Sequence, residues 1–161
     1  MTLGMSLPVF TLFHVIISLI GIGSGFIVMF GMLNAKSLPR WTAIFLITTV
    51  ATSVTGFMFP YEGFKPSYVF GVISLIVLAL AIVARYGCHL AGAWRWIYVV
   101  SSIIALYLNV FVAIFQSFLK VPALHALAPT GKEPPFAIAQ LTVMALFVAL
   151  GFLAVRKFRL A

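Results

Sequence analysis

Residues 94 to 120, WRWIYVVSSIIALYLNVFVAIFQSFLK, form an apolar run long enough to cross a lipid bilayer as one helix. Ser102, Asn109 and Gln116 recur in this run every seven residues, so a helix would carry them along one face. Hydrocarbon offers no hydrogen bonds, and an amide left in it costs about 4 to 8 kcal/mol on the water-to-cyclohexane scale. The polar face must therefore lie against other helices, and the sequence predicts a helical bundle.

The composition places the chain in a membrane. Of its 161 residues, 64% are hydrophobic and 7% are charged, which leaves too few polar side chains to cover a water-soluble globule. The net charge of +8 does not indicate nucleic-acid binding, because the basic residues lie at the ends of apolar runs, where they orient a membrane protein. From this composition and charge pattern we expect the lipid bilayer, and no nucleic acid, as a partner. The single cysteine, Cys88, excludes an internal disulfide.

Five apolar runs predict an all-α fold, a polytopic bundle of five transmembrane helices that forms a single domain over residues 1–161. The expected spans are residues 7–33, 41–59, 67–85, 95–119 and 135–155. The first run has no basic residue before it and is too long for the core of a signal peptide, so we interpret it as a retained span. Five crossings place the two ends of the chain on opposite sides.

The basic residues predict the orientation. Seven of them lie on one side of the predicted bundle and three on the other. The larger set is Lys36, Arg40, Arg85, Arg95, Arg156, Lys157 and Arg159, and the smaller set is Lys65, Lys120 and Lys132. Because the side richer in lysine and arginine faces the cytoplasm, we expect the N-terminus outside and the C-terminus inside.

Polar side chains from several spans are predicted to gather in the outer half of the bundle. The candidate ligand-binding residues are His14, Thr55, Gln116 and Gln140 in the outer half, Asn109 near the middle, and Glu62 and His125 in the outer loops. Amide and ionisable side chains are costly inside a span and are therefore functional-site candidates. We predict an outward-facing polar pocket, with His14 and Glu62 as its titrating groups.

A small amphipathic molecule would suit such a pocket, and the candidates are a quinone-like compound or a lipid. In this hypothesis His14 or a glutamine donates to a carbonyl of the ligand, and the protein could be a redox-associated subunit. A b-type haem needs two axial ligands, and His14 with His125 is the sole pair that could supply them, so haem is not expected. Three scattered histidines without aspartate predict no metal site. No catalytic motif is recognised, so enzyme activity stays open.

Two other function classes stay open as well. Gly21 and Gly25 form the small-residue spacing that lets two membrane helices approach closely, and His14 could be a neutral imidazole bonded to a neighbouring helix. On that interpretation the chain is a structural or assembly subunit that packs against another membrane protein or a second copy of itself. A small permease is the third alternative, although no carboxylate lies inside a span to relay protons.

Several segments resemble a group of small bacterial inner-membrane proteins without an assigned activity. The segments are NVFV at 109–112, Gln116, KVPALHALAPT at 120–130 and EPPF at 133–136, together with His14, residues 48–60 and AGAWRW at 91–96. The resemblance implies a multi-pass protein of the bacterial inner membrane and implies no reaction. In size and in its polar intramembrane residues the chain is also similar, more loosely, to the small DoxX-like four-helix proteins associated with quinone-linked respiration. Its fifth predicted span departs from that pattern.

Overall fold

The computed structural model describes residues 2–159, and within this range the chain folds into helices without a β-strand. The helices are α1 (Leu7–Leu33), α2 (Pro39–Phe57), α3 (Pro66–Ile82), α4 (Trp94–Lys120), α5 (Pro122–Leu127) and α6 (Pro134–Lys157), and α3 continues into a π-helical turn, η1 (Val83–Gly87). The all-α prediction is confirmed, and the long helices begin and end within a few residues of the predicted spans.

Proline sets where most of these helices begin. A proline occupies the first or second position of α1, α2, α3, α5 and α6. Its missing N–H is no loss there, because the first N–H groups of a helix have no intrahelical partner, and its fixed φ suits the helix. Pro122 also ends α4, because a proline ring inside a helix clashes with the carbonyl four residues earlier.

Four helices in the described range are long and apolar enough to cross a membrane, namely α1, α3 together with η1, α4 and α6. These four helices indicate a helical, multi-pass membrane protein. Helix α2 has 19 residues but is not among the four. It begins with Pro39 and Arg40 and contains a run of hydroxyl side chains, which lowers its hydropathy.

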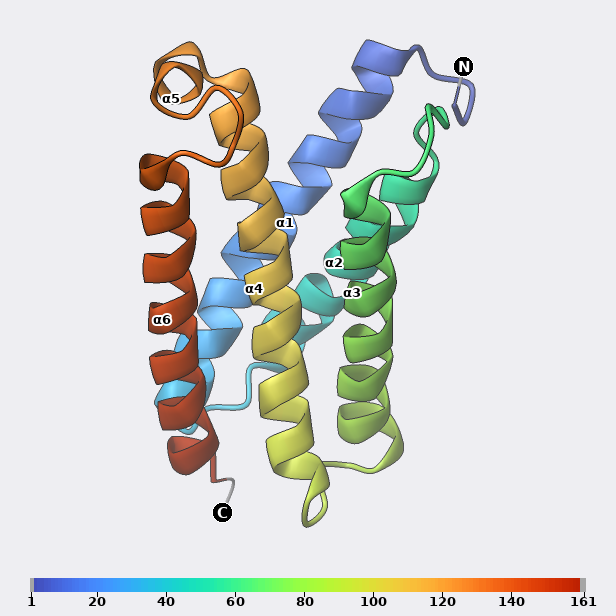
Figure 1. The fold of residues 1–161 in the computed structure, drawn as a ribbon. Coiled ribbons are helices and arrows are strands. Elements are labelled where there is room, and N and C mark those ends of the chain that lie inside the picture. Colours follow the sequence, from blue (N-terminus) through green and yellow to red (C-terminus); the bar gives the residue numbers. More distant parts are fainter. Residues whose placement is uncertain (1, 160–161) are drawn as a thin grey trace.

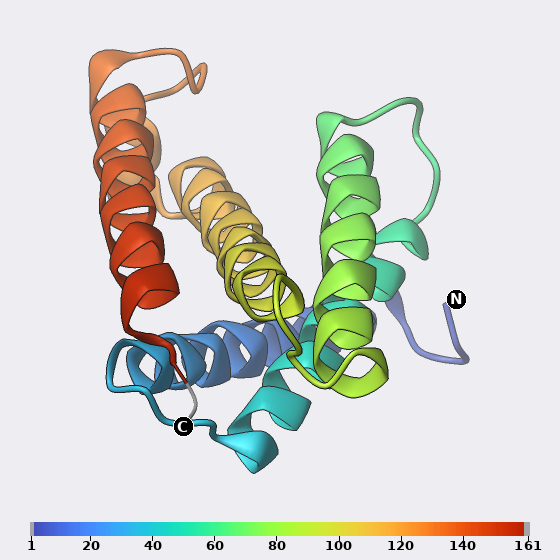
Figure 2. The same ribbon diagram turned by 90° about the horizontal axis from the view of Figure 1, so that it is seen from below.

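Helix α4 lies at the centre of the bundle and packs against α1, α2, α3 and α6. Figure 1 shows α1 leaning across the bundle, and Figure 2 shows α4 between α3 and α6 when the molecule is seen from one end. Helix α1 begins at the end of the bundle where α4 finishes, so these two helices are antiparallel (Figure 1). The short helix α5 lies across that same end.

The core is tightest where α1 meets α2 and α4. Gly25 is buried there, and a Cβ atom placed on it would lie 2.5 Å from Leu106 Cδ1 and 3.0 Å from the ring of Phe45. Leu106 and Phe45 are each 1% exposed, so an added side chain at Gly25 would press on two buried neighbours. The absent side chain of Gly25 therefore lets three helices meet closely.

The start of α4 holds a second buried cluster. Tyr98 and Phe158 are each 1% exposed, and their ring centroids lie 6.0 Å apart. Arg95 donates a hydrogen bond to the Phe158 carbonyl just after α6, and the Arg85 guanidinium lies 5.3 Å from the centroid of the Tyr98 ring. These contacts hold Phe158, directly after α6, against the start of α4.

We expect Gly25→Ala to lower the free energy of unfolding by about 1–3 kcal/mol, because its Cβ overpacks the contact with Leu106 and Phe45. Gly23→Ala is the matched control, since Gly23 is exposed and has nothing within 4 Å of a Cβ position. The control should be neutral or slightly stabilising. Unfolding in detergent micelles measures both variants, and equal effects would contradict the close contact at Gly25.

The loop between α5 and α6 is organised by the Glu133 carboxylate. This carboxylate accepts hydrogen bonds from the hydroxyl and N–H of Thr130 at 2.7 and 3.1 Å and from the N–H of Lys132 at 3.0 Å. The Thr130 hydroxyl contributes most to lowering the pKa of Glu133 from 4.5 to about 2, and the backbone N–H groups add to this effect.

Because the pKa of Glu133 is lower in the folded protein, its carboxylate should order the loop above pH 4.5 and stop doing so as the pH falls towards 2. Hydrogen exchange of the Thr130 and Lys132 amides measures this ordering. We expect Glu133→Gln to speed exchange at neutral pH, whereas Glu62→Gln should leave it unchanged, because Glu62 pairs with Lys65 in a different loop. Equal protection of both amides in the two variants would contradict the role of Glu133.

Candidate functional site

A cavity of about 600 Å³ lies between α1, α2, α3 and α4. Its walls come from the first half of α1, the second half of α2, the start of α3 and the second half of α4, so it occupies the half of the bundle where α4 ends (Figure 1). The volume falls in the range of roughly 300–1,000 Å³ that is typical of small-molecule sites.

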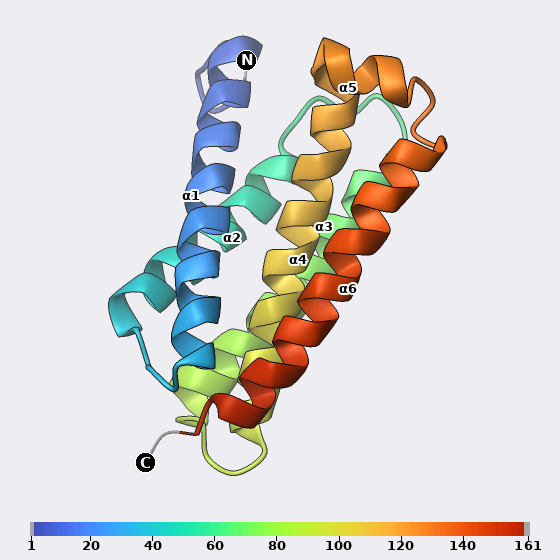
Figure 3. The same ribbon diagram turned by 90° about the vertical axis from the view of Figure 1, so that its left-hand side faces the viewer.

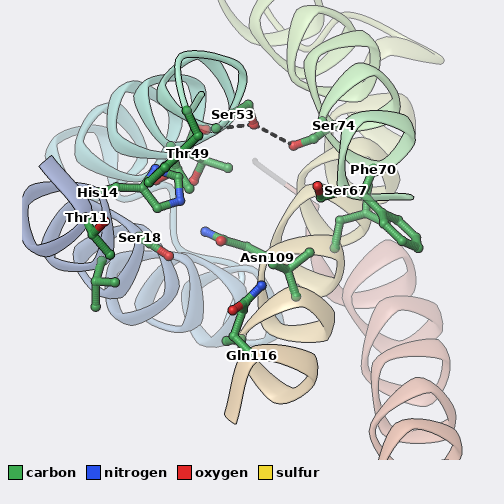
Figure 4. Close-up of a pocket in the computed structure, with 18 of the residues that line it drawn as sticks. Thr11, His14, Ser18, Thr49, Ser53, Ser67, Phe70, Ser74, Asn109 and Gln116 are labelled. Carbon is green, nitrogen blue, oxygen red and sulfur yellow. Dashed lines mark hydrogen bonds between the residues drawn. The ribbon is translucent and has the colours of Figure 1, made fainter. Parts of the chain in front are cut away.

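The close approach of α1 and α4 in mid-bundle sets the register of the cavity walls. Leu106 lies against Gly25, and Asn109 Nδ2 would lie 3.2 Å from a Cβ atom on Gly21. Because the helices are antiparallel, Gln116 and His14 each lie two turns, about 10.5 Å, further towards the same end. The side chains of His14, Asn109 and Gln116 therefore face one cavity, and Figure 4 shows them pointing towards one another from α1 and α4.

His14 is held in place by α2. Its Nδ1 lies 2.7 Å from the Thr55 hydroxyl oxygen, and the Phe59 ring stands perpendicular to the imidazole with 5.2 Å between centroids. The Thr55 hydroxyl in turn donates to the Ala51 carbonyl at 2.7 Å. Thr55 does not line the cavity itself and instead orients a side chain that does.

Several polar groups that line the cavity have no protein partner. Thr49 Oγ1 and Asn109 Nδ2 are buried and make no hydrogen bond with residues 2–159. The side chains of Ser18 and Gln116, both half-buried, also lack a hydrogen bond within that range. Most other hydroxyls of the spans donate to the carbonyl four residues earlier, as Thr52 does to Thr48 at 2.8 Å. Among residues 2–159, two of the five buried side-chain atoms without a partner therefore face the cavity, and the other three, Arg85 Nη1, Ser102 Oγ and Gln140 Oε1, lie outside it.

The rest of the wall is aromatic and basic. Phe57 and Tyr68 stack with 5.8 Å between ring centroids, and the Phe57 ring reaches α3 because Gly71 has no side chain there. Lys65 and Lys120 line the cavity near the ends of α3 and α4, and both are exposed. Neither acidic residue lines it. In Figure 3, α1 and α4 diverge from each other towards the end of the bundle that carries α5.

The structure brings together three of the seven predicted site residues and places the other four elsewhere. Glu62 is exposed in the α2–α3 loop and pairs with Lys65 at 3.0 Å. His125 is exposed on α5, with Nδ1 3.3 Å from the Phe118 carbonyl oxygen. Gln140 is buried between α6 and α4, where its Nε2 donates to the Phe111 carbonyl at 3.1 Å. Thr55, as described, lies behind His14.

Sequence reasoning did not assign Ser18, Thr49 or Lys120 to the site. Ser18 follows His14 by four residues and so shares its face of α1, which is a signal that the sequence does contain. Thr49 is one of several hydroxyl residues in α2, and nothing local distinguishes it. Its burial follows from the way α2 packs against Gly21.

The described residues contain no group of three or more His, Cys, Asp or Glu side chains that could hold a metal ion. His14 is the single histidine that lines the cavity. The site can instead offer hydrogen bonds from amides and an imidazole, aromatic faces, and the charges of Lys120 and of Lys65, the latter paired with Glu62.

Comparison of the chain with protein family models, with curated proteins and with solved structures finds no match. The function therefore has to be inferred from the chemistry of the cavity itself.

The unpartnered amide predicts how substitutions will affect stability. We expect Asn109→Leu to leave the unfolding temperature unchanged or to raise it, because Asn109 Nδ2 has no hydrogen bond to lose. Gln140→Leu removes the bond from Nε2 to the Phe111 carbonyl, a loss of about 1 kcal/mol that is partly offset because the Gln140 Oε1 removed with it is buried without a partner. Thermal unfolding in detergent compares the two variants, and a larger loss for Asn109→Leu would mean that its amide is satisfied in the folded protein.

Proposed function

We propose that this multi-pass membrane protein binds a small amphipathic molecule, a quinone-like compound or a lipid, in the cavity between α1, α2, α3 and α4. The observation that carries the proposal is the group of unpartnered polar side chains around this cavity, with Asn109 Nδ2 and Thr49 Oγ1 buried. A redox-associated subunit is the role that fits a quinone-like ligand.

Energetics favour an occupied cavity. A buried donor or acceptor that lacks a partner costs about 1–3 kcal/mol, and two such groups, Thr49 Oγ1 and Asn109 Nδ2, face the same space. A ligand head with oxygen atoms would satisfy the amides of Asn109 and Gln116. The apolar and aromatic walls, including Phe57, Phe70 and Tyr68, would pack against a ring or a hydrocarbon tail.

For the membrane arrangement we propose five crossings, with the N-terminus outside and the C-terminus inside. Helix α2 has 19 residues, about 28 Å at 1.5 Å per residue, close to the roughly 30 Å of hydrocarbon in a bilayer. The hydroxyls that lower its hydropathy donate mostly to its own backbone, for example Thr48 to Ile44 at 2.7 Å. The seven-to-three distribution of basic residues supports the orientation, and the resemblance of the sequence supports the bacterial inner membrane.

A permease is favoured less than a binding protein. Beneath the cavity, Phe45 and Leu106 close on Gly25 and fill the bundle, so a route through it would require these contacts to separate. A structural or assembly subunit, with a membrane-protein partner or a second copy, is the alternative that an empty cavity would favour.

Lipid extraction of the purified protein tests the proposal directly. We expect a quinone or another amphipathic molecule to co-purify in near-stoichiometric amount and to be identified by mass spectrometry. The visible spectrum should lack a Soret band, since a haem would need a second axial ligand beside His14. A preparation that is fully folded, binds no added amphiphile and carries none would reject the proposal.

His14→Ala should lower the amount of retained ligand about tenfold, because it removes a hydrogen-bonding group from the cavity wall. His89→Ala is the control, since His89 lies in the connector between η1 and α4, at the other end of the bundle. Ligand per mole of protein is measured after identical purification. Equal retention in the two variants would remove His14 from the site.

A further inference from the structure

The hydrogen bond between His14 and Thr55 determines which nitrogen of the imidazole carries the proton. The Thr55 hydroxyl has one proton and lies within hydrogen-bond distance of two backbone carbonyls of α2, Ala51 at 2.7 Å and Thr52 at 3.2 Å. When this proton points to a carbonyl, the hydroxyl oxygen accepts a hydrogen bond from His14 Nδ1, 2.7 Å away. In that arrangement Nδ1 is the protonated nitrogen and donates this bond.

With Nδ1 protonated, a neutral imidazole has its free lone pair on Nε2. Nε2 has no hydrogen-bond partner within residues 2–159, while the ring faces Asn109 and Gln116 across the cavity (Figure 4). An imidazolium would have no counter-ion here, because the charged groups that line the cavity are Lys65 and Lys120. Glu62 is exposed and paired with Lys65, and Glu133 is bonded within its own loop.

We propose that His14 Nε2 accepts a hydrogen bond from a hydroxyl group of the ligand, so that the cavity selects an amphiphile with a hydroxyl-bearing head over the same molecule with a carbonyl in that place. This rests on the proposed function and narrows its ligand class. It also reverses the expectation that His14 donates to a carbonyl. A carbonyl oxygen placed at Nε2 would bring two lone pairs together and leave both unsatisfied.

The amides supply the complementary half of the site. Asn109 Nδ2 is a buried donor without a partner, and it lies at the level of Gly21, deeper in the bundle than His14. A ligand that offers a hydroxyl to His14 therefore also needs an acceptor oxygen to meet Asn109. A hydroquinone meets both requirements, because each of its two oxygens can donate and accept, whereas both oxygens of the quinone can only accept.

The test compares a decyl hydroquinone with the decyl quinone of the same ring, each titrated into detergent-purified protein without oxygen and followed by calorimetry. For the unmodified chain we expect the hydroquinone to bind about tenfold or more tightly than the quinone. His14→Phe keeps a ring but removes the acceptor and should bring the two affinities together. Thr55→Val should reduce the ratio while His14 is still present, because the valine releases the Nδ1 proton from its partner.

Thr142→Val is the matched control for Thr55→Val, because Thr142 is an exposed threonine of α6 outside the cavity, and it should leave the ratio unchanged. Nitrogen-15 NMR of the histidines gives a readout that does not depend on ligand. It should find His14 protonated at Nδ1 in the unmodified chain and a mixture of tautomers in Thr55→Val.

Equal affinities for hydroquinone and quinone, or a proton found on His14 Nε2, would overturn the inference while leaving the binding proposal intact. If neither compound binds, the inference is also overturned, and lipid extraction of the purified protein then decides the proposed function by itself. If His14→Phe does not fold, Thr55→Val and the tautomer measurement still decide the outcome.

Discussion

The structure depends on the inability of hydrocarbon to form hydrogen bonds. Most serines and threonines of the long helices satisfy this constraint within their own helix by donating to the carbonyl of the preceding turn, as in Ser24 to Ile20 at 2.6 Å and Ser117 to Ala113 at 2.7 Å, whereas Thr49 and Ser102 do not. Asparagine, glutamine and histidine cannot satisfy all of their polar atoms in this way. Their placement therefore requires other helices, solvent or a ligand.

The cavity exists because two helices that touch in mid-bundle separate above the contact. Gly21 and Gly25 let α1 approach Asn109 and Leu106 closely, and α1 then leans away from α4 towards the end that carries α5 (Figure 1). The two glycines have different effects. Gly25 lets α1 pack closely against Leu106 and Phe45 below the cavity, and Gly21, one turn nearer the cavity, leaves room for the Asn109 amide.

The charged residues follow the division between these two halves. At the end where α4 begins, Arg95 and Arg85 are used in packing, against the Phe158 carbonyl and the Tyr98 ring. At the end where α4 finishes, Lys65 and Lys120 line the cavity, while Glu62 and Glu133 are engaged in loops. Because Lys65 is paired with Glu62, Lys120 supplies the positive charge at the rim of the cavity, and neither Glu62 nor Glu133 lines its wall. This arrangement favours ligands with electron-rich oxygen atoms.

The helices of this protein can be predicted from its amino-acid sequence. Helix positions follow from the length of apolar runs and from prolines such as Pro66 and Pro122, and the seven-residue spacing of Asn109 and Gln116 sets the polar face of α4, because these are properties of single segments. No pattern in the sequence predicts that Gln140 bonds to α4 outside the cavity, that Glu62 faces outward and that Thr55 supports His14; these contacts are seen in the folded bundle. Those outcomes depend on the tilt and rotation of whole helices, which are set by contacts between distant residues such as Gly25 and Leu106.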